Sequence, residues 1–464
     1  MADGKVKKLA SNLGIFAIGN LGSKLISFIL IPIFTRYMST AHFGQVDLIT
    51  TTVNMLLPIV ALSIADAVFR FVMDTDADVK AIFSTSLSFT LCTFLLAIVA
   101  LPLMIFFQVQ YAGYLLVYLA FGLLQALFQN FIRGIGYVRI FAMNGLLSSV
   151  VLAVIGTIKI VVLRQGVVGY LDALIISAFV SVVFMFCSAQ LWKFYSFSGN
   201  NAKLLKTLLV YSVPLIPNAF LWFFTNDASR FFVVGFLGLA ANGLYAVATK
   251  IPTIINVFYN IFSQAWQISA VEEYESDQRE KFFSSVFNAN VGCSVILIGG
   301  ILIFIRPVMT IYAGESYFEA WKIVPVLLIA SFFSNLSSFY GTIYLAAKKT
   351  VGIMKTTIYG MLANVIFNIT LIPLMGLQGA GIGSALGFAF VTLVRMHDTK
   401  KMIEIRVNWA QMLVSIALIL GMTGVQIFIP ASSYVTEILV GLLFSLIIIN
   451  IQSVIKVKKF RGEK

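Results

Sequence analysis

The chain has 464 residues, of which 60% are hydrophobic and only 11% are charged, and its formal net charge is +13. Soluble domains carry roughly 25% charged residues, so this composition excludes a water-soluble globular protein. The apolar runs are continuous rather than alternating, which excludes a transmembrane β-barrel. The basic residues fall in short loops, so we assign the positive charge to membrane topology and not to nucleic-acid binding.

Apolar runs of about 20 residues, the length that spans a bilayer, recur along the chain between short polar breaks. They predict an all-α integral membrane protein with about fourteen transmembrane helices. The first run contains Lys24 and no small-residue cleavage site follows it, so we expect it to remain as the first helix. The predicted helices cover residues 12–35, 46–72, 82–107, 112–132, 141–163, 170–192, 210–236, 243–270, 284–312, 319–346, 355–374, 378–396, 409–429 and 434–454.

The distribution of basic residues predicts the orientation of these helices. With the N-terminus inside, twenty-four of the 32 basic residues fall in inside segments, and only Arg36 and Arg164 lie clearly in outside loops. Cytoplasmic loops carry the excess of Lys and Arg in membrane proteins. We therefore expect a multi-pass protein of the cytoplasmic membrane with both termini in the cytoplasm.

Two predicted helices are long and rich in residues that allow bending. The first contains three glycines and Pro32, and the seventh contains Pro214 and Pro217. Glycine and proline permit kinks and leave backbone groups to be satisfied by a cavity or by neighbouring helices.

The same two helices match each other in sequence. The first reads NLGSK at its middle and the seventh reads NDASR. The matched residues are Asn20, Ser23 and Lys24 in the first helix and Asn226, Ser229 and Arg230 in the seventh. Both helices run from inside to outside, which predicts parallel repeats of six helices each. We expect an N-lobe over residues 1–206, a C-lobe over 207–400, and two additional helices with a basic cytoplasmic tail over 401–464.

Charged residues at bilayer depth are candidate functional residues, because each costs at least roughly 2.5–3.5 kcal/mol. Lys24 and Arg230 lie near mid-span at equivalent positions of the two repeats. The alternative for Arg230 is a structural ion pair with Asp227, three residues earlier. Asp66 and Arg70 lie four residues apart on one helix face, where either a local salt bridge or a coupling site fits.

Polar residues add to this picture of a cavity. Lys250 lies about two turns into the eighth helix, where it would line the outer part of a cavity. The polar cavity candidates are Asn20, Ser23, Asn226 and Ser229. They can hydrogen-bond sugars or water, or hold helices together. The cations outnumber the two aspartates, so the cavity should prefer an anion, and phosphate or pyrophosphate is the natural candidate.

Other chemistry is not indicated by the sequence. Cys92, Cys187 and Cys293 lie in apolar stretches, and their odd count without paired spacing argues against disulfides or a metal site. No P-loop is present, and the predicted loops are too short for an extramembrane catalytic domain. We therefore predict no metal, no cofactor and no enzyme activity.

Two stretches carry a resemblance to a known family: GNLGSKLISFILIPIFTRYMSTAHFGQVDLITT and YSVPLIPNAFLWFFTNDASRFFVVGFLG. The chain resembles the Wzx-type oligosaccharide flippases, the polysaccharide-biosynthesis branch of the MATE-like (MOP) flippase superfamily. The resemblance implies two six-helix lobes around a central cavity, with two extra helices. It also implies translocation of undecaprenyl-pyrophosphate-linked repeat units from the inner to the outer leaflet.

The resemblance further implies roles and partners. Lys24 and Arg230 would bind the pyrophosphate, with Arg70 and Lys250 less securely placed. Ion coupling varies in the superfamily, which leaves Asp66 as a candidate together with Asp227. The implied partners are the lipid-linked oligosaccharide, membrane lipids, and a polysaccharide polymerase with its assembly machinery, which would join the units into O-antigen, capsule or exopolysaccharide.

Three alternatives share parts of this pattern. A MATE-type drug or cation antiporter would favour a carboxylate-dominated cavity, against the basic bias observed. A flippase for the peptidoglycan lipid precursor shares fourteen helices and a basic cavity. A membrane polymerase would need polar outer loops with catalytic groups, and the outer loops here, such as QVQYAG and YAGESY, are too short and poor in such groups.

Overall fold

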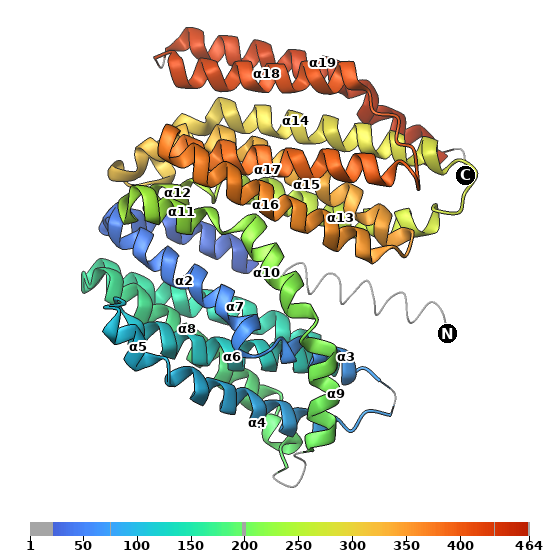
Figure 1. The fold of residues 1–464 in the computed structure, drawn as a ribbon. Coiled ribbons are helices and arrows are strands. Elements are labelled where there is room, and N and C mark those ends of the chain that lie inside the picture. The colour runs from blue at the N-terminus through green and yellow to red at the C-terminus, as the bar shows by residue number, and fades with distance from the viewer. Residues whose placement is uncertain (1–21, 75, 197–200, 431, 463–464) are drawn as a thin grey trace. The chain divides into compact units, whose positions relative to one another are not determined.

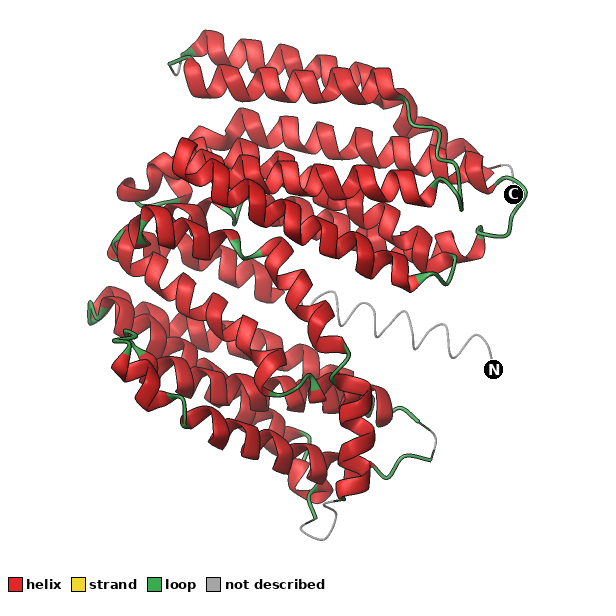
Figure 2. Ribbon diagram, viewed as in Figure 1, coloured by secondary structure: helices red, strands yellow, loops and turns green. Residues whose placement is uncertain are grey.

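The computed structural model describes residues 22–74, 76–196, 201–430 and 432–462. Within these residues all regular structure is helical, as Figure 2 shows. Twelve of the helices described here are long and apolar enough to cross a membrane. The chain is thus a multi-pass, all-α membrane protein, as its composition predicts.

The chain divides into two compact units, Met1–Phe223 and Phe224–Lys464, and the division falls inside α10. The helices of the first unit are 22–37, α2 (Thr40–Val60), α3 (Ile64–Phe71), α4 (Val79–Ile98), α5 (Leu101–Phe106), α6 (Ala112–Gly134), α7 (Val138–Gly156), the π-helix η1 (Thr157–Val162), α8 (Gly166–Ser188), the 3-10 helix η2 (Leu191–Phe194), α9 (Ala202–Ser212) and most of α10 (Leu215–Asn226).

The second unit holds the remaining helices, coloured from green to red in Figure 1. They are α11 (Ser229–Leu237), α12 (Leu239–Ala248), α13 (Pro252–Glu272), α14 (Arg279–Tyr312), the 3-10 helix η4 (Glu315–Lys322), α15 (Val324–Ala346), α16 (Thr350–Met375), α17 (Leu377–Thr399), α18 (Trp409–Phe428) and α19 (Ser433–Gly462). The predicted lobe boundaries at residues 206 and 400 stay predictions.

Two of the fourteen predicted helices are not among the twelve spans. The first, over 12–35, falls partly outside the described residues, and its later part lies in the helix 22–37. The eighth, over 243–270, is present as α12 and α13 with a turn between them, so the prediction of one continuous helix is wrong there. Pro252 is the first residue of α13, a position where the missing N–H of proline costs no hydrogen bond.

The second predicted helix, over 46–72, is also interrupted. It begins earlier, at Thr40, after Ser39 accepts a hydrogen bond from the amide of His42 as an N-cap. It then breaks into α2 and α3 at a turn where Leu62 and Ser63 adopt left-handed backbone conformations, with φ of 48° and 51°. The amide of Ser63 donates to the carbonyl of Pro58 at 2.9 Å, which closes the turn.

Aromatic and aliphatic packing holds the first unit together. Phe131 of α6 is fully buried and packs against Phe83 of α4 with ring centroids 4.5 Å apart. Val68 of α3 and Met185 of α8 belong to the same buried cluster. Helices α3, α4, α6 and α8 therefore share one packed core in the first unit.

A row of glycines lets α17 approach α16 closely in the second unit. Gly379, Gly383 and Gly387 recur every four residues, so they lie on one face of α17. A Cβ at Gly383 would lie 3.2 Å from the amide nitrogen of Asn368, and one at Gly387 would lie 3.1 Å from the Cα of Asn364. Small residues at helix interfaces let membrane helices pack backbone to backbone.

The last two helices, α18 and α19, pack against each other and against α14 (Figure 1). A buried polar network joins them. Asn450 of α19 accepts from Gln411 Nε2 at 2.7 Å and donates to Ser415 Oγ at 2.9 Å. Because the side chain of Asn450 is fully buried, these hydrogen bonds hold α18 and α19 in one register.

Replacing Asn450 with alanine should lower the thermal stability of the purified protein. The substitution leaves Gln411 without its acceptor and removes the two buried hydrogen bonds to α18, worth about 0.6 to 1.7 kcal/mol each between membrane helices. The control is Ser445→Ala on the same helix, because that exposed hydroxyl bonds only to its own helix at Gly441. Equal unfolding midpoints for the two variants would refute the role of the network.

The segment between α17 and α18 is fastened to α14. The amide of Arg406 donates to Ser284 Oγ at 2.8 Å. Asn288 donates to the carbonyl of Arg406 and accepts from the amide of Asn408, both at 3.0 Å. Residues 403–408 have no regular secondary structure, yet their backbone groups bond to α14 in place of a helix or sheet.

Candidate functional site

Among the candidate residues, Arg230 lies in the first turn of α11 and is held by an ion pair. The preceding helix, α10, ends at Asn226, and the chain turns at Asp227 and Ala228 before α11 begins. Arg230 forms an ion pair with Asp227, and the two side chains are 13% and 41% exposed. The sequence left open a structural ion pair here, and the structure contains it.

Helix geometry at this break favours an anion. The N-terminus of a helix carries a partial positive charge, although in α11 the amides of Arg230 and Phe231 already donate to the carbonyls of Asp227 and Ala228. Arg230 adds a full positive charge to the same turn of α11. In transporters, half-helix N-termini at such breaks face anionic substrate groups.

The polar neighbours of Arg230 differ in accessibility. Asn226, at the end of α10, is half-buried. Ser229 is only 2% exposed, and its hydroxyl lies 3.2 Å from the hydroxyl of Ser384 on α17. The burial of Ser229 favours helix–helix contact, the second of the two roles that the sequence left open.

In the first unit, Lys24 lies on the helix 22–37 with its side chain exposed. The carbonyl of Ser23 accepts a hydrogen bond from Ser27 Oγ at 2.9 Å, so its backbone is engaged inside the helix. Asn20 lies outside the described residues. A cavity shared by Lys24 and Arg230, which belong to different units, stays a prediction.

Of the two alternatives left open for Asp66 and Arg70, the local salt bridge between them is not what the structure contains. Arg70 forms its ion pair with Asp74, four residues later, and both side chains are about half exposed. Asp66 instead lies within electrostatic reach of Arg133 on α6. The α-helical spacing allows Arg70 to reach an aspartate on either side, and Asp74 lies beyond the end of α3, where the pair costs little desolvation.

A small cavity adjoins Asp66 inside the first unit. Its volume is about 170 Å³, and its polar lining residues are Ser63, Asp66, Thr90 and Asn130. The hydroxyl of Ser63 is buried and has no hydrogen-bond partner among the described residues. A space of this size holds several water molecules, which need polar partners of this kind.

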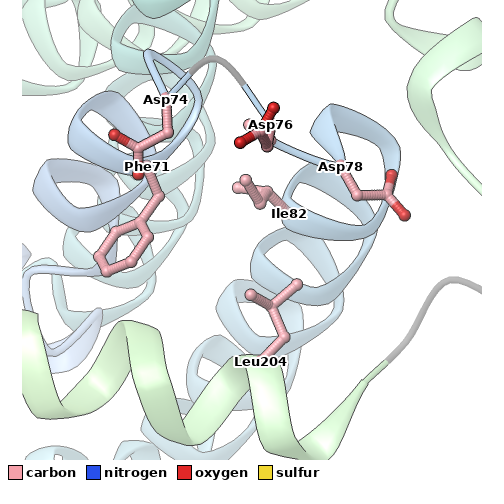
Figure 3. Close-up of a pocket in the computed structure, with 7 residues that line it drawn as sticks. Phe71, Asp74, Asp76, Asp78, Ile82 and Leu204 are labelled. Carbon is pink, nitrogen blue, oxygen red and sulfur yellow. The ribbon is translucent and has the colours of Figure 1, made fainter.

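A second pocket, of about 500 Å³, lies at the loop between α3 and α4 (Figure 3). Figure 3 shows Phe71, Ile82 and Leu204 below and the loop aspartates Asp74 and Asp76 above. Asp78 accepts from the amide of Ala81 and caps α4. The carboxylates repel an anion, so this pocket does not suit a phosphate group.

Lys250 lies in the turn between α12 and α13, at a second helix break in the same unit as Arg230. Its side chain is half-buried, and its amide donates to the carbonyl of Val247 at 3.1 Å. The sequence placed Lys250 within a continuous helix, whereas the structure places it at a turn.

Two cations on helices were not singled out from the sequence: the half-buried Arg133 and the buried Arg395. Arg133 lies over the ring of Phe69 at 4.0 Å and donates to Asn130 Oδ1 at 3.2 Å. Arg395 of α17 is 8% exposed, and its guanidinium donates to Ser337 and to Thr356 and Thr357. The predicted helix 112–132 ended just before Arg133, whereas α6 continues to Gly134. Arg395 lay in the last turn of the predicted helix 378–396 and was assigned to the inside charges, whereas α17 continues to Thr399.

Metal chemistry has no candidate in the described residues, which contain no group of three or more His, Cys, Asp or Glu side chains placed to hold an ion. The three cysteines, Cys92, Cys187 and Cys293, are free thiols with exposed side chains. The arrangement provides cations, hydroxyls and amides, which bind and orient a polar ligand.

Comparison with known proteins gives one family match, one curated relative and several structures of similar fold. Residues 9–267 match the family model described as polysaccharide biosynthesis protein. A probable low-salt glycan biosynthesis flippase of Haloferax volcanii is 22% identical over 260 residues, which are 54% of each chain. The chain thus spans about half the length of the curated relative it matches.

Two solved structures share the fold over most of their length. The lipid II flippase MurJ, in an inward closed conformation, is 12% identical with a TM-score of 0.67, covering 97% of this chain and 98% of that one. An inward-facing multidrug resistance transporter of the MATE family, in the MOP superfamily, is 15% identical with a TM-score of 0.64, covering 87% and 94%. At these identities the likeness establishes the fold.

Proposed function

Because the chain belongs to the polysaccharide biosynthesis protein family, we propose that it is a flippase for undecaprenyl-pyrophosphate-linked oligosaccharide repeat units. It moves them from the inner to the outer leaflet of the cytoplasmic membrane by alternating access. The observation that carries this proposal is the cation Arg230, held at the N-terminus of α11 where the seventh membrane helix is broken. The name of the Haloferax volcanii relative, a probable glycan biosynthesis flippase, supports the same substrate class.

The physical need for such a protein lies in the head group. Moving each sugar hydroxyl from water into hydrocarbon costs roughly 4–8 kcal/mol when nothing replaces its hydrogen bonds. A repeat unit with several hydroxyls and a diphosphate therefore cannot cross unaided at a useful rate. A hydrated cavity lined by cations and amides removes that cost, while the isoprenoid tail stays in lipid.

Each candidate residue has a role in this proposal. Lys24 and Arg230 are proposed to bind the pyrophosphate. Lys250 and Arg70 are secondary cations, and Arg70 must then leave its pair with Asp74. The residues proposed to contact sugars or water are Asn20, Ser23 and Asn226. Ser229 is buried, so its proposed role is to support these residues through its contact with Ser384. The aspartates Asp66 and Asp227 are the candidates for ion coupling.

The membrane potential can drive export. Each negative charge that moves outward across an inside-negative membrane gains about 2.3 kcal/mol per 100 mV. A doubly charged diphosphate gains about twice that amount, so transport needs no dedicated ion site. The N- and C-termini lie in the cytoplasm in this scheme, and a polymerase uses the product at the outer leaflet. The chain itself performs no covalent chemistry.

We expect flipping by the reconstituted protein to accelerate when an inside-negative potential is imposed. The measurement uses proteoliposomes with a fluorescent undecaprenyl-pyrophosphate oligosaccharide and follows its protection from an impermeant quencher. A potassium diffusion potential made with valinomycin is compared with equal potassium on both sides. A rate that does not change with the potential would contradict the electrogenic mechanism.

The same vesicles test the function itself. Flipping of the oligosaccharide-linked lipid above the rate of protein-free vesicles supports the proposal. Fluorescent lipid II in a parallel sample tests the peptidoglycan-precursor alternative, and ethidium efflux tests the drug-antiporter alternative. Ethidium efflux without flipping of either lipid would refute the flippase proposal.

A further inference from the structure

Three hydroxyl groups meet beneath the break that precedes α11. They come from three helices: Ser229 from α11, Tyr245 from α12 and Ser384 from α17. The hydroxyls of Ser229 and Ser384 lie 3.2 Å apart, and the phenol of Tyr245 hydrogen-bonds both. The three side chains are 2%, 3% and 7% exposed, so this hydroxyl cluster is closed to solvent.

The hydroxyl cluster adjoins the candidate anion site. Ser229 directly precedes Arg230 in the chain, and both Arg230 and Asp227 lie close enough to Tyr245 to act on its phenol electrostatically. The first turn of α11, which carries the guanidinium, is therefore the turn that the cluster holds. Ser229 cannot rotate with α11 without losing its partners on α12 and α17.

The chain on the two sides of the break belongs to different units. Ahead of α10, α9 packs on α3 and α4 in the first unit. After the break, α11 packs on α12, α16 and α17 in the second unit. The division between the units falls at Phe223 and Phe224, within the last turn of α10 before the Asp227–Ala228 turn.

These observations indicate that α11, after the break, is held rigidly, whereas α10, before it, can change its angle. A buried hydroxyl without a hydrogen bond is costly, so the hydroxyl cluster resists separation of α11 from α12 and α17. At Asp227 and Ala228 the backbone bonds change to the i→i−3 type, with the amide of Arg230 on the carbonyl of Asp227 and the amide of Phe231 on that of Ala228, a local geometry at which a helix can bend.

We propose that Ser229, Tyr245 and Ser384 form a positioning device that keeps Arg230 fixed on the second unit while α10 changes its angle at the Asp227–Ala228 turn. The device preorganises the guanidinium, so a diphosphate binds without first ordering it. The part of this inference that names a diphosphate rests on the proposed function. The fixing of α11 stands on the hydroxyl cluster alone.

Binding of farnesyl diphosphate to the full-length protein in detergent, measured by calorimetry, tests the positioning role. Ser384→Ala should weaken binding about two- to tenfold, the usual loss for one hydrogen bond. Ser384→Thr, which keeps the hydroxyl, should restore most of the affinity. Farnesol, which lacks the diphosphate, should bind all variants equally, so a loss shared by both probes would overturn the inference.

A double-mutant cycle separates positioning from general stability. If Ser384 acts through Arg230, the double variant Ser384→Ala with Arg230→Ala should bind no more weakly than Arg230→Ala alone. Additive losses would overturn the proposal. The matched control is Ser177→Ala, which breaks a partly buried hydroxyl pair of the first unit, Ser148 with the buried Ser177 at 3.0 Å, and should leave affinity unchanged.

A spin label tests the fixing of α11 without any ligand. The label is attached to Arg230→Cys after the three native cysteines are replaced by serine. Tyr245→Phe and Ser384→Ala should each increase the mobility of the label in the electron paramagnetic resonance spectrum, and unchanged mobility would overturn the device. Increased mobility together with normal diphosphate binding by Arg230→Ala would keep the device and refute the proposed function.

Discussion

Replacing Arg230 with alanine should lower flipping of the lipid-linked oligosaccharide by about ten- to a hundredfold, since a hydrogen bond to a charged group is worth about 1.5–3 kcal/mol. Lys24→Ala should have a similar effect, because the two cations are proposed to share one diphosphate. Surface polysaccharide in cells and flipping in proteoliposomes are the two measurements, each with the amount of membrane-inserted protein determined in parallel.

The control for these variants must also leave an aspartate without its cation. Lys159→Ala does so, because Lys159 pairs with Asp172 at 3.0 Å in the first unit, away from the helix breaks. It should retain nearly full activity, and Arg230→Lys should retain part of it through its charge. Normal polysaccharide in both Lys24→Ala and Arg230→Ala cells would defeat the proposed diphosphate site.

Replacing Gly379 with alanine should destabilise the second unit strongly. The added methyl would lie 2.0 Å from the carbonyl oxygen of Leu371 and 2.4 Å from its carbon, and both are backbone atoms of α16. Since no side-chain rotation relieves this overlap, α16 and α17 must separate, and we expect a loss of about 3 kcal/mol or more. The unfolding midpoint should fall by about 5 °C or more.

Gly441→Ala is the matched control for this prediction. Gly441 also lies within a helix, and nothing comes within 4 Å of the Cβ that it would gain. Alanine is a better helix former than glycine by about 1 kcal/mol, so this variant should unfold at the same temperature or higher. An unfolding midpoint for Gly379→Ala equal to that of Gly441→Ala would show that the helices separate freely.

The sequence predicted the membrane class, the family resemblance and the approximate helices. Long apolar runs leave few alternatives to helices in a bilayer, because every backbone group must be bonded internally. The family resemblance is confirmed by the match over residues 9–267, and the helical fold by the transporter structures. The break between α2 and α3 was not predicted from the sequence. Leu62 and Ser63 adopt left-handed conformations there without a glycine, and Pro58 is the one nearby residue that suggests a turn.

Side-chain partners could be predicted only where they are local. Arg230 and Asp227 are three residues apart, and their pairing was among the alternatives considered. Asp66 and Arg70 satisfied the same local rule, but the electrostatic interaction of Asp66 with Arg133 on α6 depends on packing that no spacing encodes. Arg395 illustrates the same limit, because its acceptors, such as Ser337 and Thr356, come from helices far apart in sequence.

The fastening of residues 403–408 to α14 has a consequence for the terminal pair of helices. An unattached connector would allow α18 and α19 to move laterally in the bilayer, independently of the other helices. Here Arg406 and Asn408 are bonded to α14, so we expect the pair to move together with that helix. We therefore expect α18 and α19 to present an unchanging surface to lipid, so that, under the proposed function, the isoprenoid chain would enter at another face.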